Sequence, residues 1–571
     1  MSELKATNAM RIALALKRNG VKYLFGQSNP PTITLACDDI GIKQIGYRQE
    51  NAGAYMAHGY AMTTNTIPVV TAQNGPAATL LVPGLAESLK SSYPVVAIVE
   101  EIERGHEEKN AFQEFDHLEL FKGVSKWVKR IPIHEKIEDF VDRAFTIAGS
   151  GRPGPVVLLC PKDIINDQTE YPVNAQRNAS LGTFPLDRTV ADPSKVEEAA
   201  IMLAAAENPI IYAGGGVVSS DALNEIRELQ EECAIPVATT TMGKGSVDEE
   251  HPLSIGPIGY YMGKRGVSTQ LKSMVQRADV IVLVGNRTNQ NGTDSWTLLP
   301  STAKYIHIDI DPTEIGRNYE SLRLVGDAKL TLKSLKEKLA EQGVEKRRKN
   351  RSRIEDEIRA SRIKHNEIMA QLLKEDDGKI KVETFLNAVN KRLSDDHIVV
   401  ADASISSVWN ANYIQATKNR KFIFPRGLAG LGWGLPMAMG AKVAHPNRKV
   451  FCLAGDGGFA HVWSELETCK RLGINIVLIV INNGILGYQK LGETALFGRY
   501  TNVCDFSAVD HTKVAEACGI KTVSVRNVSD INGALDDAFN HDGSVLIDLI
   551  SDPENIPPIT IMDGLIKEKV K

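Results

Sequence analysis

The chain has 571 residues, of which 43% are hydrophobic and 24% are charged, and its formal net charge is −4 at pH 7. A chain of this length should form about three to four domains, each large enough to bury its own core. The small net charge gives no reason to expect nucleic acid or a membrane surface as a partner. No apolar run approaches the roughly eighteen residues that a membrane-spanning helix needs.

The seven cysteines form no Cys-x-x-Cys pair, and most of them lie in apolar runs, as is typical of buried thiols in a reducing compartment. The amino-terminal segment has the pattern of an amphipathic helix that ends at Gly20, with neither a long apolar core nor a cleavage site. The sequence therefore predicts a cytoplasmic protein without a signal peptide.

Apolar runs of strand length alternate with helical patterns along the chain, which predicts parallel sheets with helices on both faces. The fold class that we expect is α/β, with three consecutive parallel-sheet domains. The predicted parts are a first domain at 1–180, a central domain at 190–345, a third domain at 370–553 and a carboxyl-terminal tail at 554–571. A polar, proline-containing stretch near 170–192 is typical of a linker, and the run of alternating charge at 335–367 predicts a solvated helical connector.

In the first domain, Glu50 follows a predicted strand and opens a predicted helix. That helix carries small residues at Gly53, Ala54, Ala57, Gly59 and Ala61. A face of small residues permits close packing, and we expect it to meet another subunit. A glutamate in the first turn of a helix is also what the helix dipole alone favours, so the residues by themselves leave a structural and a catalytic role equally open.

Three predicted strands of the central domain end in glycine or polar residues. The three strand ends are Gly214-Gly215-Gly216, Gly285-Asn286-Arg287 and Asp309-Ile310-Asp311. Nucleotides bind at the carboxyl edge of such sheets, where these strand ends meet. Each segment alone is commonly only a turn, but the three together indicate a nucleotide site.

The third domain contains two strand ends with metal-binding chemistry. The apolar strand at 449–454 ends at Gly455-Asp456-Gly457-Gly458, and the apolar strand at 475–481 ends at Asn482-Asn483-Gly484. The two ends should lie side by side at the carboxyl edge of the sheet. Carboxylate and amide oxygens are ligands that Mg²⁺ or Ca²⁺ prefers, and the glycine turn offers backbone N–H groups to the phosphates that Mg²⁺ bridges. A helix cap and an Asn-Gly turn would explain either end alone, but both ends in one βαβ unit favour a metal and phosphate site.

This stretch resembles the thiamine diphosphate fingerprint, in which Gly-Asp-Gly is followed by Asn-Asn after a characteristic interval, here twenty-four residues. The resemblance implies that Asp456, the Asn483 amide and the main-chain carbonyl of Ile485 bind Mg²⁺, and that Mg²⁺ holds the diphosphate of thiamine diphosphate. It also implies cofactor contacts from the flanking residues Gly455, Gly457, Gly458, Leu486 and Tyr488.

Thiamine chemistry also requires one buried carboxylate with a raised pKa at N1′ of the cofactor's pyrimidine. Residues 47–61 resemble the strand-to-helix segment of thiamine diphosphate enzymes of the acetohydroxyacid synthase type, which carry this glutamate at the place of Glu50. The similarity then runs over nearly the full length. The other segments that carry it are 73–79 (QNGPAAT), 110–116 (NAFQEFD), 125–127 (SKW) and 430–436 (GLGWGLP).

The resemblance to acetohydroxyacid synthase implies a pyrimidine-binding first domain and a diphosphate-binding third domain. The implied catalytic residues are Glu50, Gln113 and Lys126. The implied cofactor contacts in these segments are Asn74, Gly75, Leu431 and Gly432. Leu431 would be the apolar wedge that bends the cofactor, and Phe112 would form part of the apolar wall around the reacting centre.

The central domain resembles the FAD site of biosynthetic acetohydroxyacid synthase. The resemblance implies a structural FAD contacted by Gly215, Arg287 and Asp309, since carboligation requires no redox change. Oxalyl-CoA decarboxylases use the same region for ADP and CoA, and catabolic acetolactate synthases leave it empty. We therefore expect FAD, with ADP as the alternative.

The function that we expect is decarboxylation and carboligation of a small 2-oxo acid, dependent on thiamine diphosphate and Mg²⁺ and similar to acetolactate synthase. The first domain supplies Glu50 and the third supplies the diphosphate site. In the family such a site joins two subunits, so we expect a homodimer or a dimer of dimers. Two alternatives stay open: a 2-hydroxyacyl-CoA lyase or oxalyl-CoA decarboxylase-like enzyme, and a non-catalytic nucleotide-binding scaffold.

The chain departs from the family just after the two asparagines. The family reads roughly Leu-Gly-Met-Val-x-Gln-Trp there, and its Trp helps to select the larger second 2-oxo acid. In this chain Gly492 occupies the Trp position and Tyr488 replaces the Met, and residues 27–31 (QSNPP) depart from the family's Gly-Gly turn. Loss of an indole removes a large apolar wall. The sequence therefore predicts that this is not a dedicated branched-chain biosynthetic synthase and that its substrate is bulkier or more polar than pyruvate.

Overall fold

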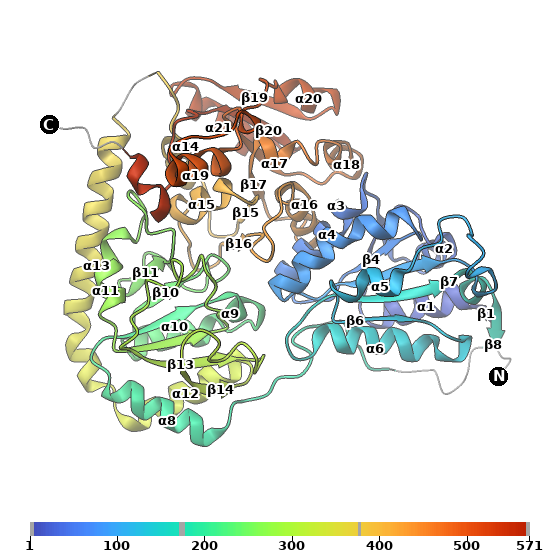
Figure 1. Cartoon of the computed structure of the whole chain (residues 1–571), viewed down its shortest axis with the longest axis horizontal. Helices are drawn as coiled ribbons and strands as arrows, with labels where there is room; N and C mark the ends of the chain where they lie inside the picture. The colour runs from blue at the N-terminus through green and yellow to red at the C-terminus, as the bar shows by residue number, and fades with distance from the viewer. Residues whose placement is uncertain (1–4, 171–177, 375–377, 567–571) are drawn as a thin grey trace. The chain divides into compact units, whose positions relative to one another are not determined.

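The structure is a computed structural model that describes residues 5–170, 178–374 and 378–566. It contains three six-stranded parallel sheets with flanking helices (Figure 1), and a short antiparallel pair formed by β1 (Lys5–Thr7) and β8 (Gln168–Glu170). The predicted α/β class with three consecutive parallel-sheet domains is therefore confirmed. Within the described ranges, no helix combines the length and the apolar character needed to cross a membrane.

The first sheet is formed by strands within residues 1–180. They are β2 (Tyr23–Phe25), β3 (Lys43–Ile45), β4 (Val69–Ala72), β5 (Val96–Glu101), β6 (Trp127–Arg130) and β7 (Val156–Pro161), in the order β3-β2-β4-β5-β7-β6. The main helices are α1 (Asn8–Arg18), α2 (Pro31–Asp39), α3 (Glu50–Thr64), α4 (Pro76–Ser91), α5 (His117–Lys122) and α6 (Ile137–Gly149). Strands β5 and β7 are buried at every position, as expected for parallel strands covered on both faces.

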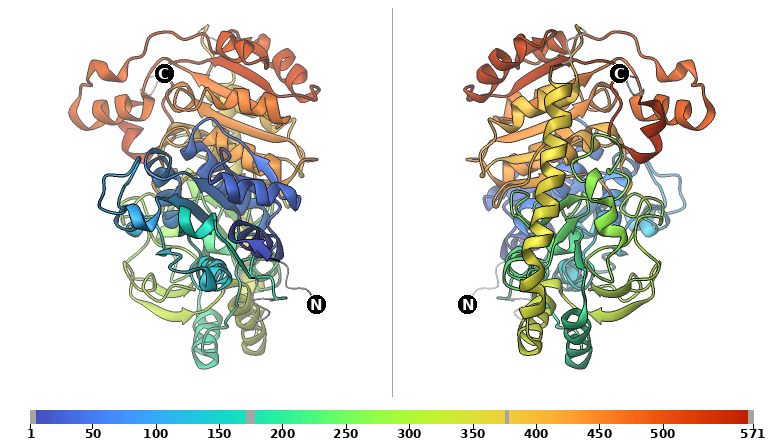
Figure 2. Two further views of the ribbon diagram at one scale, coloured as in Figure 1. Left: turned by 90° about the vertical axis from the view of Figure 1, so that its right-hand side faces the viewer. Right: turned by 90° about the vertical axis from the view of Figure 1, so that its left-hand side faces the viewer.

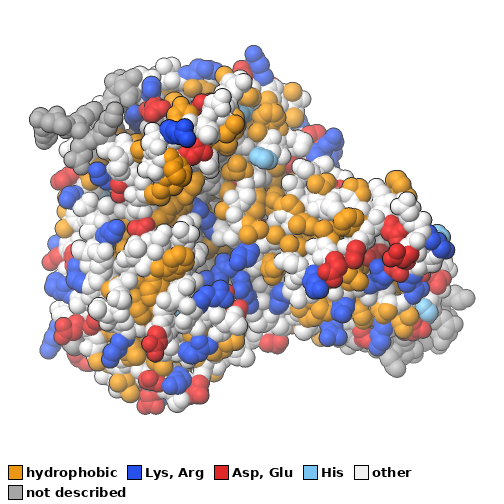
Figure 3. All heavy atoms as spheres, viewed as in Figure 1, with side chains coloured by type: hydrophobic (Ala, Val, Ile, Leu, Met, Phe, Trp, Pro, Cys, Tyr) orange, Lys and Arg blue, Asp and Glu red, His pale blue; other side chains and the backbone are white. Residues whose placement is uncertain are grey.

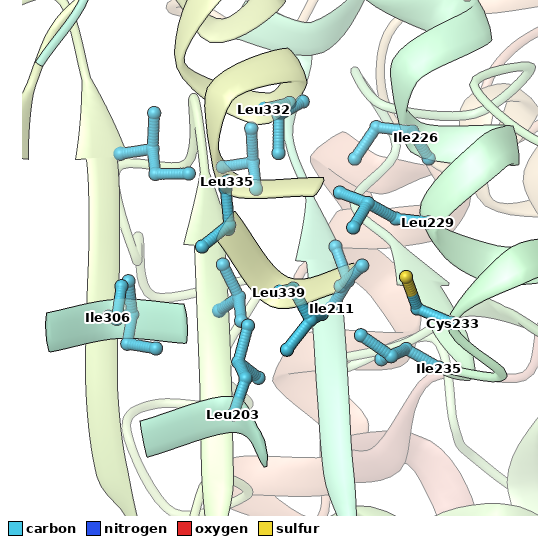
Figure 4. Packing of buried hydrophobic residues seen from close by; sticks show 14 of the residues in the cluster. Leu203, Ile211, Ile226, Leu229, Cys233, Ile235, Ile306, Leu332, Leu335 and Leu339 are labelled. Atoms are coloured by element: carbon cyan, nitrogen blue, oxygen red, sulfur yellow. The ribbon is translucent and has the colours of Figure 1, made fainter. Parts of the chain in front are cut away.

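The second sheet lies within residues 190–345. Its strands are β9 (Pro209–Ala213), β10 (Val237–Thr239), β11 (Ser254–Pro257), β12 (Val280–Val284), β13 (Lys304–Asp309) and β14 (Ser321–Val325), in the order β11-β10-β9-β12-β13-β14. Helices α8 (Pro193–Ala205), α10 (Leu223–Glu232) and α12 (Ala328–Gln342) pack against it. Figure 4 shows Leu203, Leu229 and Leu335 of these helices meeting Ile211 and Ile306 of the sheet in one buried cluster.

The charged connector predicted at 335–367 is helical, but it is not simply solvated. It covers the end of α12 and most of α13 (Glu345–Leu372), the long helix that runs beside the central domain in Figure 2. The contacts run from Arg347 to the Cys233 carbonyl (3.1 Å), from Arg351 to the Glu231 carboxylate (2.8 Å) and from Arg362 to the His251 carbonyl (2.7 Å). The expectation of a solvated face was wrong at these positions, because long arginine side chains reach the carbonyls at helix and loop ends.

The third sheet lies within residues 370–553. Its strands are β15 (Ile398–Ala401), β16 (Lys421–Ile423), β17 (Val450–Gly455), β18 (Val477–Asn482), β19 (Lys521–Val525) and β20 (Val545–Ile550), in the order β16-β15-β17-β18-β20-β19. The main helices are α14 (Val382–Asn390), α15 (Ile405–Tyr413), α16 (Gly434–Ala444), α18 (Glu465–Leu472), α19 (Gly487–Phe497), α20 (His511–Ala517) and α21 (Asp530–Phe539). Its strand order matches that of the first sheet position by position, so these two sheets share one topology.

Contacts within the chain divide it into two compact units. The first unit comprises Met1–Asp187, Pro425–Asn447 and Val462–Ile476, and the second comprises Arg188–Phe424, Arg448–His461 and Val477–Lys571. Helices α16 and α18 of the third domain therefore belong to the first unit, whereas the sheet of that domain belongs to the second. The domain boundaries that we expected stay predictions, although each sheet lies inside one of the predicted ranges.

Helix α3 packs directly on α16 through glycine. A Cβ atom at Gly59 would lie 2.3 Å from the carbonyl oxygen of Met437, and one at Gly440 would lie 1.9 Å from the carbonyl oxygen of Met56. Only glycine permits this approach of two backbones. The expectation that this face of α3 meets another subunit was wrong for Gly59, because α16 of the same chain offers a complementary small-residue face.

We predict that Gly440→Ala destabilises the fold. The added methyl group would overlap the Met56 carbonyl, so α3 and α16 must separate, and we expect a loss of about 1–3 kcal/mol in the free energy of unfolding. Gly533→Ala in α21 is the matched control, since a Cβ atom there meets nothing within 4 Å. Alanine is the better helix former, so this control should gain up to about 1 kcal/mol. Denaturant unfolding measures both changes, and equal values for the two variants would contradict the account.

Candidate active site

The Gly-Asp-Gly turn and the paired asparagines lie at neighbouring strand ends, as predicted. Strand β17 ends at Gly455, which pairs with Ile481 of β18. Asp456 then opens the short helix α17 (Asp456–Phe459) and is only 8% exposed. Its carboxylate accepts hydrogen bonds from the backbone N–H groups of Gly457 (2.9 Å) and Gly484 (2.8 Å). Burial raises the pKa of Asp456, so its ionised form needs the neighbouring N–H groups or a cation.

The two asparagines have different surroundings. The Asn482 amide donates to the Val509 carbonyl (3.0 Å) and the Asp548 carboxylate (3.0 Å), so it is a buried structural group. The Asn483 amide oxygen accepts from the Ile485 N–H at 3.2 Å, which closes the turn after β18. Asn483 rather than Asn482 is therefore the residue of the pair that lies beside the Asp456 turn and fits a ligand role.

A second segment fixes the loop that follows Asn483. The Leu486 N–H donates to the Cys504 carbonyl (2.8 Å), and the Phe506 N–H donates to the Gly484 carbonyl (2.8 Å). A Cβ atom at Gly457 would lie 3.1 Å from the Phe506 ring. The Phe506 ring therefore packs closely against the glycine turn at Gly457, and the neighbouring Gly458 is also buried.

The donor set at these strand ends fits a hard divalent cation. Among the residues that the structure describes, no cluster of three or more His, Cys, Asp or Glu side chains could hold a metal ion. A metal here would therefore rely on one carboxylate, one amide oxygen and one main-chain carbonyl. Such an oxygen set suits Mg²⁺, which takes few protein ligands and completes its shell with phosphate and water.

In the first unit, Glu50 is the first residue of α3 and is half-buried. Burial raises its pKa above the ordinary value for a glutamate, and its own backbone N–H opposes the shift. The Tyr47 hydroxyl donates to the Thr71 carbonyl (3.0 Å), and the Tyr47 ring leaves no room for a side chain at Gly53. Glu50 is therefore a carboxyl group that retains its proton more readily than usual at the rigid start of a helix.

The structure brings Asn74, Gly75 and Gln113 together. The Asn74 amide donates to the backbone carbonyls of Phe112 (3.2 Å) and Gln113 (3.0 Å). Gly75 has φ +67°, and a Cβ atom there would lie 2.8 Å from the Gln113 Cβ. The Gly75 N–H donates to His117 Nε2 (3.0 Å), so this buried histidine, which the sequence analysis did not single out, supports the turn.

Lys126 has a different setting from the one that we expected. Its ammonium group donates to the carbonyls of Ile147 and Ser150 (2.9 Å) at the carboxyl-terminal end of α6. These contacts are those of a helix-capping lysine. The catalytic role of Lys126 stays a prediction, and its contacts give that role no support.

Leu431 and Gly432 lie in the loop before α16, in the first unit. Gly432 has φ +87°, a conformation that favours glycine. The buried carboxylate of Glu87 accepts from the backbone N–H groups of Gly427 (2.6 Å), Leu428 and Ala429 (3.3 Å) in the same loop. No pattern near Glu87 in the sequence indicates this contact, because its partners lie in another domain.

The central-domain residues lie at the ends of neighbouring strands. Gly215, Arg287 and Asp309 follow or end β9, β12 and β13, which are adjacent in the sheet. A Cβ atom at Gly214 would lie 2.2 Å from the Gly285 carbonyl oxygen, so backbone packing alone requires glycine there. The Asp309 carboxylate accepts from the Asp311 N–H at 2.9 Å. The glycines therefore have a structural cause, whereas Arg287 and Asp309 remain the candidates for a nucleotide contact.

Three family models match the chain. They are the thiamine pyrophosphate enzyme N-terminal TPP binding domain at 7–120, the central domain at 196–335 and the C-terminal TPP binding domain at 402–549. Among curated relatives, a probable acetolactate synthase large subunit of Methanocaldococcus jannaschii is 32% identical, with 99% of this chain and 95% of the relative covered. Another from Methanococcus aeolicus is 33% identical, with coverage of 97% and 94%. The acetolactate synthase isozyme 2 large subunit of Escherichia coli is 31% identical, with coverage of 96% and 97%.

The chain belongs to the thiamine diphosphate enzymes of the acetolactate synthase type. The expected dependence on thiamine diphosphate is confirmed at the level of the family. The matched N-terminal domain contains Glu50 and Gln113, and the matched C-terminal domain contains Asp456 and Asn483. Lys126 lies outside all three matched ranges.

Proposed function

We propose that this thiamine diphosphate enzyme is Mg²⁺-dependent, decarboxylates a small 2-oxo acid and joins the remaining fragment to a second carbonyl compound. The observation that carries the proposal is the buried Asp456 carboxylate beside the Asn483 turn, at adjacent strand ends of a matched TPP binding domain. The Mg²⁺ ligands would be the Asp456 carboxylate, the Asn483 amide oxygen and the Ile485 carbonyl. The contacts to the rest of the cofactor would come from Gly455, Gly457, Gly458, Leu486 and Tyr488.

When bound, thiamine diphosphate supplies the carbon nucleophile and the electron sink for decarboxylation. Glu50 would hold a proton at the pyrimidine N1′ position, which suits a carboxyl group whose pKa is raised by burial. Leu431 would support the cofactor as an apolar wedge, and Asn74 and Gly75 would contact it from their turn. Gln113 would orient the substrate, since its Oε1 atom is buried and has no hydrogen-bond partner.

We propose that the protein acts as a homodimer or a dimer of dimers. Glu50 belongs to the first compact unit and Asp456 to the second. Each unit also carries strongly exposed aromatic side chains, Phe112 (84%) in the first and Phe497 (72%) in the second. Figure 3 shows further hydrophobic side chains over α4, where Leu80 is 38% exposed. Contact with a second copy would remove such groups from water, which favours association.

For the central domain we propose FAD as a structural ligand, with ADP as the alternative. The support is the position of Gly215, Arg287 and Asp309 at adjacent strand ends. A 2-hydroxyacyl-CoA lyase or an oxalyl-CoA decarboxylase-like activity is the second candidate function. It is favoured by the open space at Gly492, where a Cβ atom would meet nothing within 4 Å.

The proposed function is tested by denaturing the purified protein, identifying the released cofactors and assaying pyruvate consumption with thiamine diphosphate and Mg²⁺. Thiamine diphosphate with FAD supports the synthase-like activity, and thiamine diphosphate with ADP supports the acyl-CoA alternative. Failure to bind thiamine diphosphate even when it is supplied with Mg²⁺ would overturn the proposal.

We predict that Glu50→Gln keeps cofactor binding but slows activation of the cofactor. General acid–base groups contribute about 10²–10⁴-fold, so exchange of the cofactor C2 proton should slow by that order. Proton exchange followed by NMR after rapid quenching measures the rate. Glu135→Gln changes an exposed acid of the same unit and should exchange as the unaltered protein does. An unchanged rate in Glu50→Gln would move the role to another residue.

We predict that Asp456→Ala abolishes Mg²⁺-dependent retention of thiamine diphosphate. The variant loses the only carboxylate of the proposed ligand set, and Mg²⁺ depends on hard oxygen ligands. Equilibrium dialysis with and without Mg²⁺ measures retention, with Asp537→Asn on the exposed surface of α21 as the control. A variant that still retained the cofactor only when Mg²⁺ was present would refute the metal assignment.

We predict that the protein discriminates little between acceptor 2-oxo acids. Gly492 provides no indole wall at the position where the family has Trp. The protein should therefore show little preference for 2-oxobutyrate over pyruvate, since apolar pockets discriminate by only about 1–3 kcal/mol per methylene. Competition between the two acceptors, with both products quantified, measures the preference. Gly492→Trp should raise it, and Gly492→Ala should leave it unchanged. A strong preference for 2-oxobutyrate in the unaltered protein would show that another residue forms the wall.

A further inference from the structure

Two buried glutamates occupy equivalent places in the first and third domains. The two sheets have the same strand order, and β4 and β17 are the third strands in their sheets. One of the two glutamates lies in the helical segment that follows each of these strands. Glu87 lies in α4, which follows β4, and Glu465 opens α18, the second helix after β17. Both side chains are fully buried, with 0% exposure, and both belong to the first compact unit.

Glu465 holds the backbone that leads into Glu50. Its carboxylate accepts from the N–H groups of Arg48 (3.1 and 3.3 Å) and Gln49 (3.2 Å), and from the Thr468 hydroxyl (2.9 Å). Gln49 is the residue immediately before α3 and makes no side-chain cap of its own. A residue of the third domain therefore fixes the start of the helix that bears the candidate acid.

Glu87 makes the corresponding contact from the first domain to the third. Its carboxylate accepts from the N–H groups at 427–429 and from the Ser91 hydroxyl (2.6 Å). This loop leads to Leu431, so a residue of the first domain fixes the loop that bears the candidate wedge. Burial raises the pKa of Glu87 to about 7, and the N–H donors and Ser91 oppose that shift.

The contact between α3 and α16 is reciprocal in the same way. Gly59 meets the backbone of Met437, and Gly440 meets the backbone of Met56. Each glycine follows its own methionine by three residues. The two carboxylate contacts therefore flank one close helix pair, so a shift at either loop is resisted by the same packed interface.

We propose that Glu87 and Glu465 are paired positioning residues, each of which holds the loop that carries a cofactor-facing residue of the other domain. Glu465 positions Glu50, and Glu87 positions Leu431. The inference rests on the proposed roles of Glu50 and Leu431. A carboxylate suits the task because both oxygens accept hydrogen bonds, whereas an amide would place an N–H₂ group against backbone donors.

The test compares Glu465→Gln and Glu87→Gln in the full-length protein. Charged hydrogen bonds contribute enough that amide exchange at 48–49 should accelerate about 10- to 100-fold in Glu465→Gln, and at 427–429 in Glu87→Gln. Exchange is followed by mass spectrometry without cofactor. Thr468→Val and Ser91→Ala are the matched controls, because they remove only the hydroxyl partner and should leave both loops protected.

Two cofactor measurements separate positioning from stability. Glu465→Gln should slow exchange of the cofactor C2 proton while the Kd for thiamine diphosphate with Mg²⁺ changes little. Glu87→Gln should weaken that Kd by about 10-fold through loss of the Leu431 support. If either Gln variant fails to fold, Glu465→Asp and Glu87→Asp take its place. They keep the carboxylate on a side chain that is one methylene shorter, and they should change amide exchange, C2 proton exchange and Kd in the same directions but by smaller factors.

The proposal is overturned if the variants leave both loops as protected as in the unaltered protein. It is equally overturned if they loosen the loops, or only lower the Tm, while C2 exchange and Kd stay unchanged. Glu50→Gln is measured alongside. If Glu50→Gln also exchanges normally, the proposed role of Glu50 has failed, whereas normal exchange in Glu465→Gln alone rejects only the positioning role.

Discussion

The backbone contact between α3 and α16 is the constraint on which the arrangement of the first unit depends. Cβ atoms at Gly59 and Gly440 would overlap facing carbonyl oxygens, so the contact exists only because both positions lack a side chain. Glu50 opens α3, and Leu431 lies just before α16. Two functional candidates from distant parts of the sequence are therefore attached to opposite members of one closely packed helix pair.

The buried carboxyl groups of this protein have different surroundings, which suit different roles. Asp456 faces two backbone N–H groups and lies beside an amide oxygen, which suits a cation site. Glu50 has burial as the main influence on its pKa, which suits proton transfer. Glu87 and Glu465 are saturated with backbone donors and suit a positioning role. In the proposed roles, the same side-chain chemistry would serve metal binding, acid–base catalysis and positioning, according to the balance of burial and hydrogen bonding around each carboxyl group.

Much of the fold and part of the site could be predicted from the sequence, because their signals are local. Continuous apolar runs mark buried parallel strands, and the Gly-Asp-Gly and Asn-Asn segments stand where those strands end. The buried glutamates that the sequence patterns did not indicate depend on distant partners. Glu465 accepts from the Arg48 backbone, 417 residues away in the sequence, and Glu87 accepts from the Gly427 backbone, 340 residues away. No periodicity or spacing encodes such pairs, since they arise only when the helices pack.

Local patterns also failed where they were ambiguous. A small-residue face predicts close packing but not its partner, so the partner of Gly59 was wrongly assigned to another subunit. Alternating charge predicted solvent around α13, yet Arg347 is buried against backbone carbonyls. In each case the residue type was recognised, while its contact was decided by tertiary structure.

The proposed dimer would bring Glu50 of one subunit and Asp456 of another to the same cofactor. This proposal is tested by combining Glu50→Gln and Asp456→Ala subunits, each with its own affinity tag, and isolating the mixed assemblies. Each variant alone should be inactive. Mixed assemblies should regain activity, because one site then contains an unaltered Glu50 and an unaltered Asp456 from different chains. Mixed assemblies as inactive as their parents would contradict it and would place both residues of each site on one chain.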